Sequence, residues 1–225
     1  MRTEDLIKNL AGEAPPVKRL PNPLPRTAIW LALSLPWVGA VVFIMGLRPD
    51  LAAQASHTRW LVEQSAALAT ALMAAMAAFC AGVPGRPRWE HFLPLLPLAV
   101  WIGALGQGCI ATWLSYGPGG LSLTPDWQCL PGIMMVGLGP AVAMTIMILR
   151  GSPIAPTTTV ALGALAAGGL AEVGLRLFHQ VDASLMVLVW QAGTVVGLTL
   201  VASFFGRKIL RWRIAAPNTS VMKSK

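Results

Sequence analysis

Long intervals without a charged residue constrain this chain more than any other feature of its sequence. There are six, each of 21 residues or more, at 27–47, 64–85, 91–125, 127–149, 151–171 and 183–206. About 20 mostly apolar residues are enough for a helix to cross the hydrocarbon core of a bilayer. Five intervals fit one crossing each. The longest, 91–125, fits one crossing followed by a loop rich in Gly and Pro at 116–125.

The sequence therefore predicts an all-α, polytopic membrane protein, a bundle of six transmembrane helices. Charged residues make up 12% of the chain, about half the share in soluble domains, which excludes both a soluble and a disordered protein. We expect the chain to divide into three segments: a cytoplasmic N-terminal partner-binding segment at 1–26, a transmembrane domain at 27–206 and a basic cytoplasmic tail at 207–225. The expected helices lie near 28–46, 61–82, 93–115, 129–149, 157–178 and 185–205.

The distribution of basic residues predicts the topology. An even number of helices places both termini on one side. Of the 17 Lys and Arg residues, 14 lie on that side, and Arg48, Arg59 and Arg176 lie on the other. The positive-inside rule then puts both termini in the cytoplasm. The net charge of +8 thus sets topology, so we expect no direct nucleic-acid binding.

A cleaved signal peptide is the alternative for the first apolar interval, because Ala53-Gln-Ala55 has suitable small-residue spacing. The long leader, the full-length apolar stretch and the intervening Arg48-Pro49-Asp50 disfavour it. Six of the nine Trp residues lie near predicted helix ends, as expected for an interfacial belt.

Ionisable groups inside a bilayer are costly and suggest function. Glu172 and Arg176 lie four residues apart in the fifth predicted helix, so they share a face and can pair. An ion pair that helps Arg176 reach the outer interface is favoured over a proton or ion site. Glu63 follows Arg59 by four residues, where the same pairing applies.

No motif of an enzyme or of a metal site is present. The chain has no phosphate-binding Walker loop, no GxSxG and no HExxH. The three His residues fall at predicted helix ends, where they are interfacial polar residues rather than ligands. We therefore expect a protein that is not an enzyme, with no cofactor, no metal and no small-molecule substrate.

Small residues and cysteines mark two further features. The stretch 161–171 is rich in Ala and Gly, which predicts a buried bundle helix because small side chains let helices approach closely in lipid. Cys109 and Cys129 fall at comparable outer depth if the third and fourth helices are neighbours. A disulfide between them is one hypothesis. Two buried thiols are the alternative that the spacing favours.

The leader combines a short amphipathic helix with a Pro-rich tether. Thr3 is a candidate N-cap, and Glu4 and Asp5 follow in the first turn. Leu6, Ile7 and Leu10 share one side of the helix, and Gly12 can end it. Such a helix is marginal alone, so it needs a partner groove or the bilayer surface. Its acidic start favours a basic protein partner.

Several of these segments resemble NrsF-type proteins, a family of six-helix inner-membrane anti-sigma factors. They are Thr3-Glu-Asp-Leu-Ile7, Ala14-Pro-Pro-Val-Lys-Arg-Leu20, Arg26, Cys129, Leu149-Arg-Gly-Ser-Pro153 with Pro156, the stretch 161–171, Leu177-Phe-His179, Trp190 and Gly206-Arg207. The resemblance implies a negative regulator of transcription that holds an extracytoplasmic-function sigma factor through Thr3, Asp5, Leu6, Ile7 and Leu10. It also implies a location in the bacterial inner membrane and release of that factor by a periplasmic or envelope stress signal.

The resemblance further implies signal sensing by cysteines on the outer face. The family pattern has one Cys at the start of helix four, matched by Cys129, and a second directly after the turn that ends helix five. This chain has Gln180 there. The alternatives are that Cys109, a weaker candidate, replaces the missing thiol, that Cys129 acts alone, or that this chain senses another signal. His179 is a further weak candidate for sensing. A small six-helix transporter or channel with a Glu172 site is the alternative function, and scarce intramembrane polar residues disfavour it.

Overall fold

The computed structural model describes residues 2–13, 21–117, 129–151, 155–179, 189 and 193–214. Within these ranges every regular element is helical, and no strand occurs. The all-α prediction is confirmed there. The eight α-helices and the 3₁₀ helix η1 are α1 (Thr3–Glu13), α2 (Pro23–Met45), α3 (Leu51–Ala55), α4 (Thr58–Ala81), η1 (Arg88–Phe92), α5 (Leu95–Tyr116), α6 (Cys129–Leu149), α7 (Pro156–Leu175) and α9 (Gly193–Ile214).

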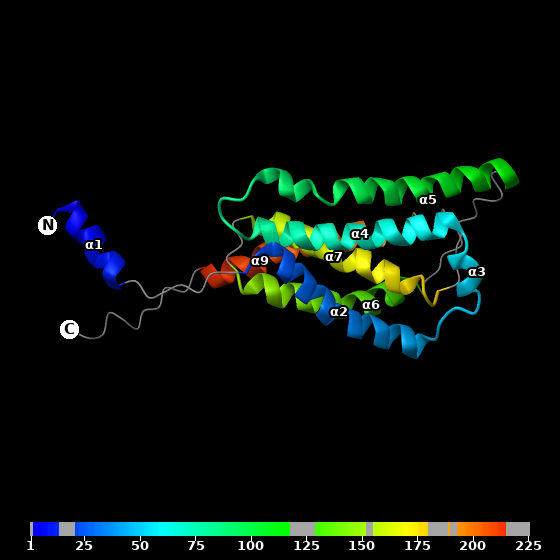
Figure 1. Cartoon of the computed structure of the whole chain (residues 1–225), viewed down its shortest axis with the longest axis horizontal. Helices are drawn as coiled ribbons and strands as arrows, with labels where there is room; N and C mark the ends of the chain where they lie inside the picture. Colours follow the sequence, from blue (N-terminus) through cyan, green and yellow to red (C-terminus); the bar gives the residue numbers. More distant parts are fainter. Residues whose placement is uncertain are drawn as a thin grey trace.

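The six long helices α2, α4, α5, α6, α7 and α9 form an elongated bundle in which successive helices run in opposite directions (Figure 1). We call the end where α2 begins and α9 ends the N/C end, and the opposite end, which carries α3, the α3 end. Figure 1 draws α1 apart from the bundle, beyond the N/C end.

Five stretches are long and apolar enough to cross a membrane: Pro23–Met45, Thr58–Ala81, Arg88–Tyr116, Leu130–Leu149 and Pro156–Leu175. They match the first five predicted crossings. The sixth prediction, 185–205, is only partly covered, because residues 180–188 and 190–192 lie outside the described residues. The described apolar part of α9, Gly193–Phe204, is shorter than a crossing. The helix also continues to Ile214, into the predicted basic tail.

Proline and glycine set several helix boundaries. Pro23 and Pro156 occupy the first turns of α2 and α7, where a missing N–H costs nothing. Gly46 ends α2 with φ +78°, a backbone conformation that residues other than glycine rarely adopt. The short helix α3 follows in the connection to α4, and the sequence did not predict it.

The bundle is tightest where α4 and α7 meet. Ala67, Ala71 and Ala171 are fully buried, and Gly169 faces the backbone of α4. Small side chains let the two helix backbones approach closely. Because α7 also contacts α2, α6 and α9, it is the central helix, and the prediction of a buried helix over 161–171 is confirmed.

Several hydroxyl groups in the bundle donate to carbonyls of their own helices. Ser34 donates to the carbonyl of Trp30 at 2.8 Å, and Thr70 donates to that of Ala66 at 2.7 Å. Thr112, Thr145 and Thr199 do the same four residues back. Since hydrocarbon offers no hydrogen-bond partner, this local pattern makes such residues compatible with a membrane interior.

We expect Gly169→Leu to destabilise the bundle by about 1–3 kcal/mol, because overpacking displaces the neighbouring helix. A Cβ atom at position 169 would lie 3.3 Å from the Ala67 carbonyl oxygen and 3.3 Å from the Ala71 Cβ. Gly103→Leu is the matched control, since no neighbouring atom lies within 4 Å of a Cβ there. The measurement is the thermal unfolding midpoint of the purified full chain in detergent. Equal midpoints for the two variants would contradict the close approach of α4 and α7.

Candidate functional site

Helix α1 presents the side chains predicted to bind a partner. Leu6 is 42% exposed and Ile7 is 59% exposed, although both are apolar. Thr3 and Asp5 are exposed as well. The side chain of Leu10, the fifth predicted residue, lies outside the described residues. An apolar pair on a short helix in water is the arrangement expected of a segment that docks into a groove.

The start of α1 differs by one residue from the prediction. The amides of Asp5 and Leu6 donate to the carbonyl of Arg2 at 3.1 and 3.2 Å, so Arg2 occupies the N-cap position and Thr3 is the first helical residue. The predicted N-cap role of Thr3 is therefore wrong. Glu4 and Asp5 remain in the first turn, where negative charge stabilises the helix dipole.

A buried ionic cluster lies toward the α3 end of the bundle. Arg176 Nη1 is 2.9 Å from Glu63 Oε2, which joins the end of α7 to α4, and both side chains are almost fully buried. Glu63 also pairs with Arg59 at 3.4 Å, as the four-residue spacing predicted. The sequence missed the pair between helices, because 113 residues separate Glu63 from Arg176.

Glu172 belongs to the same cluster. Its side chain is completely buried and lies within electrostatic range of both Arg176 and Glu63. The predicted partnership of Glu172 with Arg176 thus becomes part of a larger cluster that Glu63 joins. Nearby, Gln64 Nε2 donates to the Val173 carbonyl at 3.5 Å, adding a second polar link between α4 and α7.

Arg48 ties the connection after α2 to the end of α7. Its guanidinium contacts Asp50 with Nε–Oδ1 at 2.7 Å and Nη2–Oδ2 at 2.9 Å. Nη1 donates to the His179 carbonyl at 3.2 Å, and the Arg48 amide donates to the Leu177 carbonyl at 3.0 Å. Hydrogen bonding to Arg48 lowers the pKa of Asp50 to about 2. The carboxylate therefore stays charged in mild acid.

The predicted sensing residues are only partly described. Cys109 is a free, half-buried thiol on α5, within electrostatic range of Arg59 and Glu63. It thus lies beside the ionic cluster. His179 is half-buried and follows α7, where its carbonyl accepts from Arg48. Cys129 begins α6, but its side chain lies outside the described residues. In the described part of the chain, no three potential metal ligands come together.

Comparison with protein families decides the family of this chain. A family model, described as NrsF, negative regulator of sigma F, matches residues 10–212. The chain belongs to the NrsF family. The match covers all the long helices α2, α4, α5, α6 and α7 and nearly all of α9. Comparisons with curated proteins and with solved structures gave no match.

Membership of the NrsF family confirms the resemblance seen in the sequence and gives the chain a sigma factor as partner. It also fits a regulator rather than an enzyme. The matched range begins at Leu10, so Thr3, Asp5, Leu6 and Ile7 precede it. The family match does not include these four residues, so their role is inferred from their exposure on α1.

Proposed function

We propose that this chain is a membrane-bound anti-sigma factor that sequesters an extracytoplasmic-function sigma factor through α1. The six helices would anchor it in the bacterial inner membrane, with α9 as the sixth crossing and both termini in the cytoplasm. Thr3, Asp5, Leu6, Ile7 and Leu10 would form the binding face. Transcription is then repressed because the sigma factor is held away from RNA polymerase.

The exposure of Leu6 and Ile7 on α1 carries this proposal. Two apolar side chains on an 11-residue helix are too few to stabilise it alone in water, so a partner is needed. Of the 17 basic residues, 14 belong to the termini or to connections at the N/C end, which supports a cytoplasmic N/C end. The partner would then meet α1 in the compartment where sigma factors act.

The test is co-purification of a sigma factor with the full chain from membranes of the native host. We expect one sigma factor to be recovered with the intact chain and lost when residues 2–13 are deleted. The deletion removes α1 alone, so the amount of chain in the membrane is the control for folding. Equal recovery of the sigma factor with both chains would contradict binding through α1.

We propose that the stress signal acts at the α3 end. Cys109 and His179 lie there beside the ionic cluster and the Arg48 links, and Cys129 begins α6 at the same end. A signal can release the partner only by stabilising a bundle state with lower affinity for it. Movement of the end of α7 against α4 is such a change, because Arg176 and Glu63 join the two.

A further inference from the structure

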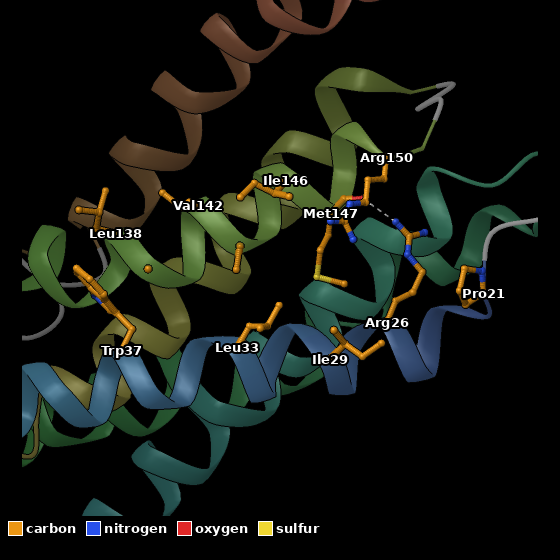
Figure 2. Close-up of a pocket in the computed structure, with 12 residues that line it drawn as sticks. Pro21, Arg26, Ile29, Leu33, Trp37, Leu138, Val142, Ile146, Met147 and Arg150 are labelled. Atoms are coloured by element: carbon orange, nitrogen blue, oxygen red, sulfur yellow. Dashed lines mark hydrogen bonds between the residues drawn. The ribbon is translucent and has the colours of Figure 1, made fainter. Parts of the chain in front are cut away.

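We propose that the cleft between α2 and α6 binds one anionic phospholipid, with its phosphate at Arg26 and Arg150 and one acyl chain along the apolar walls. The cleft measures about 580 Å³. Figure 2 places Arg26, Arg150 and Pro21 at one end of it and Trp37 and Leu138 at the other. This site is separate from α1 and does not depend on sigma-factor binding.

Both guanidinium groups at this end lack a carboxylate partner among the described residues. Arg26 is buried, and its Nη2 donates to the Met147 carbonyl at 3.0 Å. Its guanidinium also lies 4.3 Å from the centre of the Phe79 ring. These neutral contacts fix the position of the charge without neutralising it. Arg150 directly follows α6 and is exposed, so it can meet a phosphate directly.

The contact between Arg26 and Met147 has a local cause. Met147 is among the last four residues of α6, whose carbonyls have no partner within the helix. A cation is favourable at such a helix end. Arg26 is thereby held at the end of the cleft at the same level as Arg150. The fixed charge of Arg26 and the exposed charge of Arg150 then lie at the same end of the cleft.

The rest of the cleft is apolar. Ile29 and Leu33 on α2 face Val142 and Ile146 on α6 (Figure 2), and all four are exposed. Trp37 closes the far end, where its Nε1 donates to the Met135 carbonyl at 3.0 Å. An exposed apolar channel on a membrane helix pair is covered by acyl chains, because the surrounding solvent is hydrocarbon.

The length of the cleft matches one leaflet. Arg26 and Trp37 are 11 residues apart on α2, a rise of about 16 Å along a helix. Half of the hydrocarbon core of a bilayer is about 15 Å thick. An acyl chain that begins at the two arginines therefore ends near Trp37, at the middle of the membrane. Charge at one end and length along the cleft together fit an anionic phospholipid of the leaflet at the N/C end.

The experiment uses the full chain in nanodiscs of phosphatidylcholine containing a minor fraction of spin-labelled lipid. Phosphatidylglycerol and phosphatidylcholine, each labelled on the acyl chain, are compared, and the motionally restricted fraction is measured by electron paramagnetic resonance. We expect a larger restricted fraction for phosphatidylglycerol. Arg150→Gln should lower its relative affinity about fivefold, the effect of one basic residue near an anionic membrane surface.

Matched controls separate this site from general charge and packing effects. Arg88→Gln removes the same charge from an exposed residue of η1 outside the cleft, and it should leave the restricted fraction unchanged. Val142→Trp fills the cleft, whereas Val100→Trp changes a comparably exposed residue of α5, at 48% and 46% exposure. We expect only Val142→Trp to reduce binding of phosphatidylglycerol.

Equal restriction of the two lipids would overturn the proposal, because the cleft would then bind an acyl chain without discriminating between the two headgroups. Equal losses with Arg88→Gln and Arg150→Gln would also overturn it, by showing general attraction to a basic surface. Loss of sigma-factor capture in the α1 deletion is measured separately. Failure of the lipid proposal therefore leaves the proposed function standing, and the reverse also holds.

Discussion

Replacing Leu6 with aspartate is expected to lower capture of the sigma factor by the full chain about 10- to 100-fold. A buried leucine side chain contributes about 1.5–3 kcal/mol relative to an exposed one, and a charge in an apolar groove adds a desolvation cost. Ile7→Asp should have an effect of similar size, because Leu6 and Ile7 are the described apolar side chains of α1 on its binding side. The measurement is an equilibrium binding titration of the co-purified sigma factor against the full chain in detergent.

Lys8→Gln is the matched control for this effect. It shifts the charge of α1 by one unit in the same direction as Leu6→Asp, but Lys8 points away from the apolar side chains Leu6 and Ile7, on the side of the helix that carries Asp5. We expect less than a threefold change, as for a rim charge outside the apolar contact. If Lys8→Gln weakened capture as much as Leu6→Asp, binding through the apolar side of α1 would be wrong and charge alone would govern it.

The long helices were predictable because the cost of burying charge in hydrocarbon acts on each residue of a crossing. Charge-free intervals therefore reveal α2, α4, α5, α6 and α7 directly. Helix α2 begins at Pro23, several residues before the predicted start near residue 28, and Arg26 therefore lies inside the helix. An arginine near a helix end can reach a carbonyl of a neighbouring helix, so a charged residue does not always mark a boundary.

The links between helices were not predictable, because they join residues far apart in the sequence. Arg48 meets the carbonyl of His179, and Arg176 meets Glu63. Only ion pairs between residues four positions apart can be recognised from the sequence. The pair between Arg59 and Glu63 was predicted in this way. Four-residue spacing also pointed to Glu172 and Arg176, but it did not reveal that Glu63 joins them.

Reversing the charge of Glu63 is expected to be the most destabilising single change in the bundle. Glu63→Arg removes one of the two buried carboxylates near Arg176, leaving Glu172, and places a third guanidinium beside Arg59 and Arg176. Breaking a buried ion pair costs about 3–5 kcal/mol, and here three guanidinium groups would share the single buried carboxylate of Glu172. We expect a large fall in the thermal unfolding midpoint of the purified full chain and in its amount in the membrane.

Two further variants show whether the buried contact is responsible. Arg59→Gln removes the other partner of Glu63, but the Arg59 side chain is 45% exposed and its contact is 3.4 Å long. Its loss should therefore cost less than about 1 kcal/mol. Combining Glu63→Arg with Arg176→Glu restores opposite charges between α4 and the end of α7, and it should recover part of the lost stability. If Glu63→Arg were no more harmful than Arg59→Gln, the pair would not hold the two helices together, and a signal route through it would lose its basis.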